Sequence, residues 1–453
     1  MLVPDMPDRA FTYHIETYGC QMNKYDSELV AGILQAAGYR ASDVPSEADV
    51  VLVNTCSVRA SAEERARGRL HALAAFKRQG SCRVLGVLGC MGERRKAILL
   101  RDEPAVDLVL GPDEYRKLPV LLAQLLGGQD LSEPGAVPCA SETYAGIQPV
   151  RQPGISGWVA IMRGCNNFCS YCVVPYVRGP ERSRSLASIV EEVETLVANG
   201  FVEVTLLGQN VNSYRDGAND FADLLAKVAV IPGLCRVRFA TSHPKDLSAR
   251  LIHTIAAHET ICKHVHLPVQ SGSDRVLAAM NRRYTRQQYL QLVAELRRAM
   301  PDIALTTDII VGYPGEDADD FAATRSLLEV VRFDAAFLFK YSPREGTAAF
   351  QVQETVSQAE KQRRLEELIA LQKQITLEKN RERIGSVLEV LVEGPSKKSA
   401  RRMMGRTQGN MIVVLKGPDA RPGQLVRVLI TGAEGHTLFG TVVSESSLAE
   451  ATL

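Results

Sequence analysis

The chain has 453 residues, of which 45% are hydrophobic and 23% are charged, and its formal net charge is +1. This composition excludes low-complexity, collagen-like and disulfide-stapled classes, and the length predicts about three domains at ~150 residues each. No apolar run reaches the ~20 residues of a membrane-spanning helix, and the first eleven residues lack the apolar core of a signal peptide. We therefore expect a cytoplasmic protein without a membrane association.

Cysteine is the unusual residue type, because ten cysteines occur in a chain with a single tryptophan. The cytosol keeps thiols reduced, so disulfides are not expected in such a protein. The cysteine count therefore makes metal or redox chemistry the leading hypothesis. A net charge near zero gives no support to nucleic-acid binding when the chain is taken as a whole.

The first 137 residues alternate short apolar runs with helical stretches. Strands are expected at residues 13–17, 50–53, 84–88 and 106–110. Continuous Val and Leu runs indicate strands buried on both faces, so this region is predicted to be a parallel-sheet α/β domain. Cys20, Cys56 and Cys90 follow the first three runs. Since the carboxyl ends of parallel strands share one edge, these thiols are expected at the edge where ligands bind.

A Pro- and Gly-rich linker is predicted at residues 138–153, and a second βα series follows at 154–383, with a terminal charged helix. Its strands are expected at 158–162, 202–207, 235–239, 264–267, 304–311 and 335–339. The series predicts a partial (βα)6 barrel, although an open doubly wound sheet gives the same pattern. The last part, residues 384–453, has short β runs at 387–392, 411–415, 425–430 and 437–443. These runs predict a small all-β barrel.

Cys165, Cys169 and Cys172 form a C-x3-C-x2-C motif directly after the first strand of the central domain. Ten cysteines produce this spacing by chance about 0.005 times per chain. A zinc site or structural thiols are the alternatives, but zinc takes four protein ligands and no fourth Cys or His is apparent nearby. Three thiolates suit a [4Fe–4S] cluster with one open iron, at the end of a barrel where chemistry occurs.

This motif, with Tyr171 before its last cysteine, resembles the radical S-adenosylmethionine (SAM) superfamily. The resemblance implies that the open iron binds the amino and carboxylate groups of SAM, which is cleaved to a 5′-deoxyadenosyl radical that abstracts hydrogen. It also implies SAM contacts at Tyr171, Gly208, Gln209, Ser242, Gln270, Asp308 and Gly312. Taken singly, a Gly or Gln at a strand end is equally typical of turn chemistry.

The wider trio, Cys20, Cys56 and Cys90, is too dispersed for its spacing to decide between ligands and buried thiols. Its surroundings, YGCQMNKYDSE at 18–28, NTCSVR at 54–59 and GCM at 89–91, resemble the amino-terminal domain of the radical-SAM methylthiotransferases. That resemblance spans all three domains, the last being similar to a TRAM domain. It implies that the wider trio holds a second, auxiliary [4Fe–4S] cluster.

Four other cysteines and two histidines are expected to be incidental. Cys82, Cys139, Cys235 and Cys262 have no partner spacing and are interpreted as ordinary thiols. His264 and His266 alternate on a strand, but no third ligand is apparent, so a satisfied pair that lines the barrel is expected.

Two groups of basic residues are candidate RNA contacts. Residues 396–410 contain no acid and carry Lys397, Lys398, Arg401, Arg402 and Arg406. This segment is interpreted as a basic loop, either merely solvated or in contact with backbone phosphates, and the TRAM resemblance implies RNA binding. A second group, Arg178, Arg182 and Arg184, follows the compact cysteine motif. It is predicted to meet phosphates near the active site, with salt bridges to Glu181 or Glu191 as the alternative.

The cysteine surroundings resemble most the methylthiotransferases that modify tRNA. The resemblance implies transfer of a methylthio group to C2 of N(6)-isopentenyladenosine at position 37, in the anticodon loop, with one SAM as methyl donor and another as radical source. An external reductant is required, and a monomer suffices. An aromatic C–H offers no acidic proton or leaving group, so a cofactor must carry the chemistry. The adenine must also leave its stack to be reached.

Two alternative functions stay open from the sequence. The first is a methylthiotransferase of the same family that acts on a ribosomal-protein aspartate or on threonylcarbamoyl-adenosine in tRNA. The second is a non-catalytic iron–sulfur protein that binds RNA or senses redox state. No catalytic side chain beyond the cluster ligands is assigned.

Overall fold

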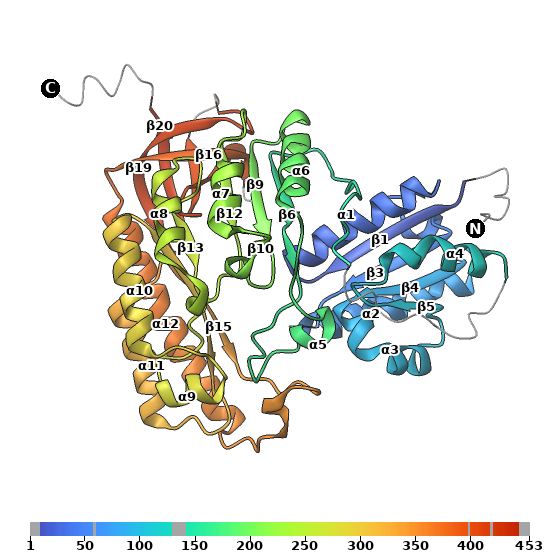
Figure 1. The fold of residues 1–453 in the computed structure, drawn as a ribbon, viewed down its shortest axis with the longest axis horizontal. Helices are drawn as coiled ribbons and strands as arrows, with labels where there is room; N and C mark the ends of the chain where they lie inside the picture. Colours follow the sequence, from blue (N-terminus) through green and yellow to red (C-terminus); the bar gives the residue numbers. More distant parts are fainter. Residues whose placement is uncertain (1–9, 58–59, 129–141, 397–398, 417–419, 444–453) are drawn as a thin grey trace.

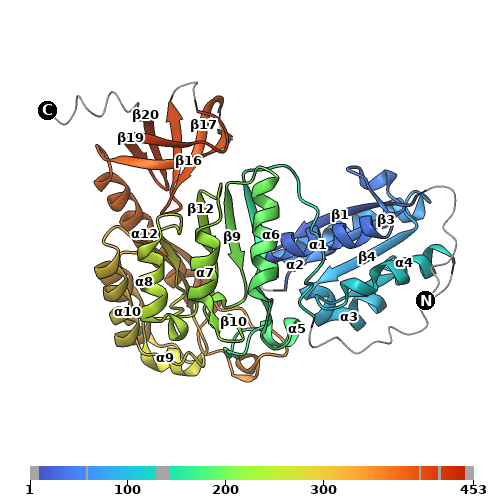
Figure 2. The same cartoon turned by 45° about the horizontal axis from the view of Figure 1, so that its top comes forward.

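The computed structural model describes residues 10–57, 60–128, 142–396, 399–416 and 420–443. An amino-terminal α/β domain, a central βα domain and a small β-barrel are arranged in that order (Figure 1). The amino-terminal domain and the small barrel lie at opposite ends of the molecule, and both pack on the central domain (Figure 2). Within these ranges, no helix has the length and apolarity that crossing a membrane requires.

The amino-terminal domain is a parallel sheet with strand order β2-β1-β3-β4-β5. Its strands are β1 (Thr12–Tyr18), β2 (Arg40–Ala41), β3 (Val50–Thr55), β4 (Val84–Gly89) and β5 (Leu108–Leu110). The α-helices are α1 (Gln21–Ala36), α2 (Ala60–Arg78), α3 (Cys90–Asp102) and α4 (Leu118–Leu126), and short 3-10 turns lie at Pro45–Glu47 and Tyr115–Lys117. The predicted α/β class is confirmed. Strand β2 was not predicted, because two exposed residues carry no apolar pattern.

The two faces of this sheet have separate cores. Leu29 of α1 and Leu122 of α4 pack on one face, whereas Leu70 of α2 and Leu99 of α3 pack on the other. Every residue of β3 is buried, as expected for a strand covered on both sides. The core on the α1 face continues into the central domain, since Ala160 and Leu207 belong to it.

The central domain has two parallel three-stranded sheets, β12-β9-β6 and β13-β14-β15. An isolated parallel bridge joins Val237, in the first sheet, to Ile261, three residues before the second sheet begins at His264. Its strands are β6 (Ser156–Ala160), β9 (Glu203–Leu207), β12 (Arg236–Phe239), β13 (His264–His266), β14 (Ala304–Val311) and β15 (Ala335–Lys340). The strands follow one another in chain order without the reversal of a doubly wound sheet. The partial (βα)6 barrel is therefore the correct alternative.

Helices cover the outside of this barrel, and short elements cross its mouth (Figure 1). The outer helices are α6 (Leu186–Ala198), α7 (Phe221–Ala229), α8 (Ala249–Ala257), α10 (Arg286–Ala299), α11 (Ala318–Val331) and α12 (Gln358–Glu382). The short elements are α5 (Val174–Arg178), α9 (Asp274–Ala279), the strand pairs β7 (Met162–Arg163) with β8 (Arg182–Ser183) and β10 (Arg215–Asp216) with β11 (Asn219–Asp220), and 3-10 turns at Val211–Ser213, Pro244–Asp246 and Ala348–Gln351.

The small domain is a closed barrel with strand order β16-β17-β18-β20-β19. Its strands are β16 (Val387–Ser396), β17 (Ser399–Thr407), β18 (Ile412–Lys416), β19 (Leu425–Glu434) and β20 (Thr437–Val442). The all-β prediction is confirmed, but β17 corrects the interpretation of residues 396–410 as a loop. Ladder pairing with β16 and β18 makes this polar segment a strand. Tertiary pairing has overridden its weak apolar pattern.

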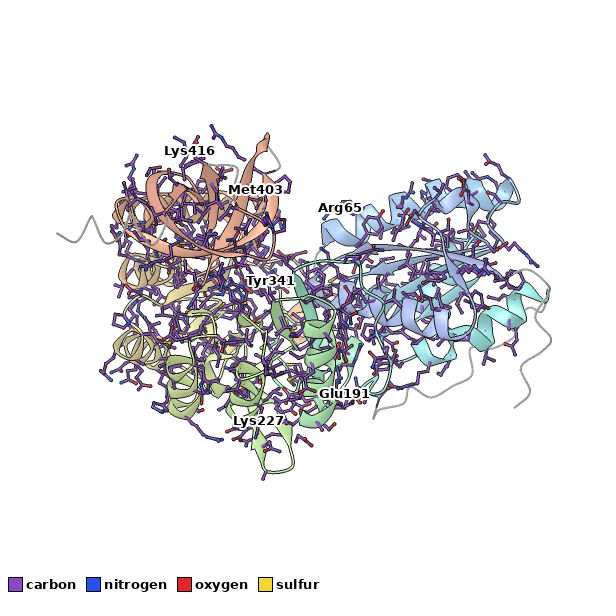
Figure 3. The ribbon with its side chains drawn as sticks, turned by 90° about the horizontal axis from the view of Figure 1, so that it is seen from above. Arg65, Glu191, Lys227, Tyr341, Met403 and Lys416 are labelled. Atoms are coloured by element: carbon purple, nitrogen blue, oxygen red, sulfur yellow. The ribbon has the colours of Figure 1, made fainter. Side chains whose placement is uncertain are left out.

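The central domain contacts the small barrel through buried arginines and the amino-terminal domain through the segment that precedes β6. Arg236 and Arg238 of β12 donate to backbone carbonyls of the small barrel. The described part of the predicted linker, residues 142–153, is packed rather than free. Its Tyr144 is buried and donates a hydrogen bond to the Pro112 carbonyl at 2.9 Å. Seen from above, Tyr341 lies near the middle of the molecule, with Met403 and Lys416 on the small barrel and Arg65 on α2 of the amino-terminal domain (Figure 3).

Candidate functional site

The dispersed cysteines meet at one edge of the amino-terminal sheet. Cys20 follows β1 and precedes α1, Cys56 follows β3, and Cys90 begins α3 directly after β4. The three strands are neighbours, as predicted. Contact with the Cys56 thiol outweighs burial and, with the charge of Arg178, lowers the pKa of Cys20 to about 6. Burial raises the pKa of Cys90, and the same guanidinium opposes this rise. The thiols are thus close enough to influence one another.

Asparagines and a glycine fix the loops that carry these cysteines. Asn23 donates from Nδ2 to Asn54 Oδ1 and to the Thr55 carbonyl, each at 3.0 Å, and its Oδ1 accepts from Cys20 Sγ at 3.2 Å. Gly89 has a φ of +88°, and a Cβ there would lie 2.4 Å from Asn54 Oδ1. Glycine is required where the backbone is both left-handed and this crowded. The asparagines of the quoted motifs therefore hold adjacent strand ends together.

Asp26 joins this edge to the central domain. Its carboxylate is fully buried and accepts from Arg163 Nη2 at 2.6 Å and from Arg178 Nη2 at 2.8 Å. Arg178 also donates from Nε to Cys90 Sγ at 3.2 Å. Burial would raise the pKa of Asp26, but the two guanidinium groups outweigh it and hold the pKa below its ordinary value of 3.8. The carboxylate is therefore charged and orders both arginines.

The compact cysteine motif lies in the loop between β7 and α5, at the carboxyl end of the barrel. Cys165 and Cys169 are buried and Cys172 is half-buried. Burial and the neighbouring Cys169 raise the pKa of Cys172 to about 12, which places the two sulfurs near one another. Arg282, also buried, lies with Nη1 3.5 Å from Cys169 Sγ. No sequence pattern singled out Arg282, because it lies 113 positions from its cysteine partner.

The backbone of this loop is held from both sides. Asn281 donates from Nδ2 to the Phe168 carbonyl at 2.9 Å, and the Cys165 amide donates to the Gly179 carbonyl at 3.1 Å. Gly164 has a φ of +79°, and a Cβ there would lie 1.9 Å from the Pro180 carbonyl oxygen. The loop path therefore depends on glycine at position 164.

The donor set of each trio, three thiols, fits a [4Fe–4S] cluster. Within the described ranges, no three Cys, His, Asp and Glu side chains are spaced as ligands of one ion. In a [4Fe–4S] cluster each thiolate binds a different iron, so the sulfurs need not converge on one point. Each trio also has a buried arginine within reach of one sulfur, Arg178 for Cys90 and Arg282 for Cys169.

The predicted SAM contacts lie around the carboxyl ends of the barrel strands. Gln209 follows β9 and Ser242 follows β12; the Oε1 of Gln209 and the Oγ of Ser242 are buried, without a hydrogen-bond partner among the described residues. Buried polar atoms are seldom left unpaired, so these two point to a polar ligand. Gly208 is crowded by Met162, since a Cβ there would lie 2.6 Å from Met162 Cγ. These residues fit a SAM site.

The remaining SAM candidates have clear structural roles. Gln270 has a φ of +70° and exchanges backbone hydrogen bonds with β14, to the Asp308 carbonyl and from the Ile310 amide. Asp308 is half-buried, and its Oδ2 lies 3.4 Å from His266 Nε2. Gly312 donates from its amide to Glu316 Oε1 at 2.8 Å. Tyr171 is half-buried, and burial raises its pKa far above the ordinary value. All lie at the barrel mouth or in the cluster loop.

The two histidines and the four cysteines outside the trios were expected to be incidental. A ring nitrogen of His264 and one of His266 each lie 3.0 Å from Thr306 Oγ1, so the pair is satisfied by hydrogen bonding. Cys82 and Cys262 are buried and Cys235 is half-buried. Cys139 lies outside the described residues.

The second basic group corrects a prediction. Arg178 and Arg184 are only 3% and 6% exposed, so they are not available to phosphates. Ion pairs join Arg178 to Asp26, Arg182 to Asp113 and Arg184 to Glu192. These carboxylates differ from the two that the sequence suggested. Two of the three pairs cross from the central to the amino-terminal domain, so this group fastens the domains together.

The first basic group is only partly described. Lys397 and Lys398 lie outside the described residues, and for Arg401 only the backbone, on β17, is described. Arg402 is exposed on the same strand. Arg406 makes an ion pair with Glu393 at 2.9 Å, so its charge is partly neutralised. Among the described members, Arg402 is thus the best candidate for a phosphate contact.

Comparison with known families agrees with this architecture. Residues 159–328 match the Radical SAM superfamily, residues 12–111 match Uncharacterized protein family UPF0004, and residues 381–443 match the TRAM domain. A solved radical S-adenosylmethionine methyltransferase, TsrM, from Kitasatospora setae has a similar fold, with a TM-score of 0.58 and 16% identity, over 76% of this chain and 77% of that one. Fold and cysteine motif together define a radical-SAM protein.

Comparison with individual relatives shows which family of radical-SAM proteins the chain belongs to. A tRNA-2-methylthio-N(6)-dimethylallyladenosine synthase from Pelodictyon phaeoclathratiforme is 47% identical over 95% of this chain and 98% of its own length. The enzyme of the same name from Porphyromonas gingivalis W83 is 49% identical over 95% and 94%. The chain belongs to the family of tRNA-2-methylthio-N(6)-dimethylallyladenosine synthases, which are radical-SAM transferases with [4Fe–4S] clusters and SAM as cofactors.

Proposed function

We propose that this protein adds a methylthio group to C2 of N(6)-isopentenyladenosine at position 37 of tRNA. The observation that carries the proposal is the coexistence of two cysteine trios in adjoining domains of a chain that is similar, end to end, to enzymes named for this product. The TRAM match supports an RNA substrate. The protein acts in the cytoplasm, as a monomer, with an external reductant.

Each trio has one assignment. Cys165, Cys169 and Cys172 hold the radical-SAM cluster, and Cys20, Cys56 and Cys90 hold the auxiliary cluster. When bound, the clusters and SAM supply the one-electron chemistry that activates an aromatic C–H and the site at which sulfur is held. The division into residues 1–137, 154–383 and 384–453 then gives each cluster, and the RNA contact, its own domain.

The side chains around the barrel mouth orient the cofactor and shield it. Gln209 Oε1 and Ser242 Oγ, which have no partner among the described residues, are acceptors for N–H or O–H groups of SAM, and Asp308 lies half-buried at the same end of the barrel. Gly208 and Gly312 are packed against Met162 and Lys361, since a Cβ there would lie 2.6 Å and 2.3 Å from the Cγ atoms of these side chains, so both positions require glycine. Arg402 of the small barrel, and Arg401 beside it, meet phosphates of the anticodon stem-loop.

The test separates the substrate alternatives. The full-length protein, reconstituted with iron and sulfide, is incubated anaerobically with dithionite, SAM and one of three substrates: tRNA with isopentenyladenosine, tRNA with threonylcarbamoyl-adenosine, or ribosomal protein. We expect 5′-deoxyadenosine, and a methylthio product on the first substrate alone. Cys165→Ala should abolish both products, whereas Cys235→Ala should leave both. A product on another substrate would overturn the proposal, and absence of 5′-deoxyadenosine would favour the non-catalytic alternative.

Iron counting tests the ligand assignment separately. Replacing either trio by alanine should remove about half of the iron, since each [4Fe–4S] cluster has the same iron content. Replacing Cys82 and Cys262 together is the matched control, since these buried thiols belong to neither trio. Full iron content after loss of the wider trio would contradict its role as ligands.

A further inference from the structure

Arg178 connects the two candidate cluster sites. It ends α5, the short helix that follows the compact cysteine loop, so its backbone belongs to the central domain. Its side chain reaches into the amino-terminal domain, where Nε donates to Cys90 Sγ at 3.2 Å and Nη2 donates to Asp26 at 2.8 Å. The residue is only 3% exposed. The side chain of Arg178 therefore links the backbone beside the compact cysteine loop directly to the sulfur of Cys90.

The guanidinium also has unused donor capacity. Its Nη1 is buried and has no hydrogen-bond partner among the described residues. A guanidinium offers five N–H donors, and a buried donor without an acceptor is unfavourable. Nε and Nη2 form the edge of the planar group that faces Cys90 and Asp26, so Nε is the donor aimed at the sulfur.

We propose that Arg178 is a positioning residue that donates a hydrogen bond from Nε to the sulfur of Cys90 and thereby raises the reduction potential of the auxiliary cluster. The inference rests on the proposed assignment of Cys20, Cys56 and Cys90 as ligands. Reduction adds negative charge to a cluster, and hydrogen bonds to its sulfurs stabilise the more negative state. Loss of this donor should therefore make the potential more negative.

Arg163 provides a matched control. It is also buried, and its Nη2 donates to the other oxygen of Asp26, at 2.6 Å. Its guanidinium lies 4.5 Å from the centre of the Tyr144 ring, whereas that of Arg178 donates to Cys90 Sγ. Arg163 thus shares the carboxylate and the interface with Arg178 but not the sulfur. A variant at either position removes one positive charge beside Asp26.

The experiment is a redox titration of the auxiliary cluster, followed by electron paramagnetic resonance. The full-length chain carries alanine at positions 165, 169 and 172, so that the auxiliary cluster alone is reconstituted. We expect Arg178→Gln to move the midpoint potential to a more negative value, Arg178→Lys to move it less, and Arg163→Gln to move it least. If Arg178→Gln does not fold, Arg178→Lys against Arg163→Lys gives the same comparison, with charge conserved.

The hydrogen-bond role of Arg178 and the assignment of Cys90 as a cluster ligand are overturned by different results. Equal shifts at Arg178 and Arg163, or an unchanged potential in both Arg178 variants, would overturn the hydrogen-bond role and leave the cluster assignment intact. Retention of the cluster by Cys90→Ala in the same background would instead overturn the ligand assignment in the proposed function. An unaltered iron content in the Arg178 variants, combined with a shifted potential, supports the inference, because a purely structural role would not move the potential alone.

Discussion

Replacing Asp26 by asparagine should weaken the interface between the amino-terminal and central domains. The carboxylate is fully buried, and the two guanidinium groups that it binds, at 2.6 and 2.8 Å, have side chains only 2% and 4% exposed. Asparagine keeps the shape but leaves two buried cations without a counter-charge. Breaking a buried pair in this way costs about 3–5 kcal/mol. The amide oxygen still accepts one hydrogen bond, so we expect a value near the lower end.

The single tryptophan reports on this interface directly. Trp158 lies on β6, packs against the core of the amino-terminal domain, and has Lys24 Nζ 5.1 Å from its ring centre. Urea unfolding of the cluster-free protein, followed by Trp158 fluorescence, should show an earlier first transition for Asp26→Asn. The multi-domain chain need not unfold in one step, so the first transition is compared. Asp102→Asn, which removes an exposed pair with Arg101, is the control and should leave the transition unmoved.

The pH dependence gives a second check on the same carboxylate. Because the folded pKa of Asp26 lies below its ordinary value, the ion pairs stabilise the fold fully above about 3.8 and are lost as pH falls through the folded pKa. The wild-type advantage over Asp26→Asn should therefore be constant from pH 8 to about 5. An Asp26→Asn transition that coincides with that of Asp102→Asn, at neutral pH, would refute the reasoning.

Three further predictions concern the cluster loop and the small barrel. Gly164→Ala should lose radical-SAM iron, measured by iron content, whereas Gly200→Ala, at φ +87° with no atom within 4 Å, should cost about 1–2 kcal/mol and keep the iron. Arg236→Leu should undock the small barrel, and limited proteolysis should then release it; an unchanged digestion pattern would contradict this. Arg401→Ala with Arg402→Ala should weaken tRNA binding and reduce the slope of log K against log salt by about 0.7 per lost phosphate contact. An unaltered slope would remove both arginines from the RNA contact.

The sequence predicted the sheet edges but not what holds them together. The strands carry strong apolar patterns, which predict where each strand ends. The convergence of Cys20, Cys56 and Cys90 then followed from the geometry of a parallel sheet. The partnership of Asp26 with Arg178 spans 152 positions, and no local pattern encodes it. From the sequence, Arg178 was therefore predicted to contact RNA phosphates. A basic residue that follows the cysteine loop is expected to face solvent when the packing of the amino-terminal domain against it is not known.

In the small barrel, the sequence failed to predict a strand. Residues 399–407 combine arginines and methionines without clean alternation, so a loop was expected where β17 lies. Pairing with β16 and β18 closes the barrel and satisfies the backbone of this segment. Local composition could not supply that information, since the partners come from either side of the strand in sequence. Arg402 nevertheless remains exposed there, as an RNA contact requires.

The most direct test of the central claim is mass spectrometry of tRNA nucleosides from cells that lack this protein. We predict that 2-methylthio-isopentenyladenosine disappears and that isopentenyladenosine accumulates in its place. The wild-type chain should restore the methylthio nucleoside, whereas Cys56→Ala and Cys169→Ala should each fail to restore it. Retention of 2-methylthio-isopentenyladenosine in the deleted cells, or full rescue by either cysteine variant, would contradict the two-cluster account.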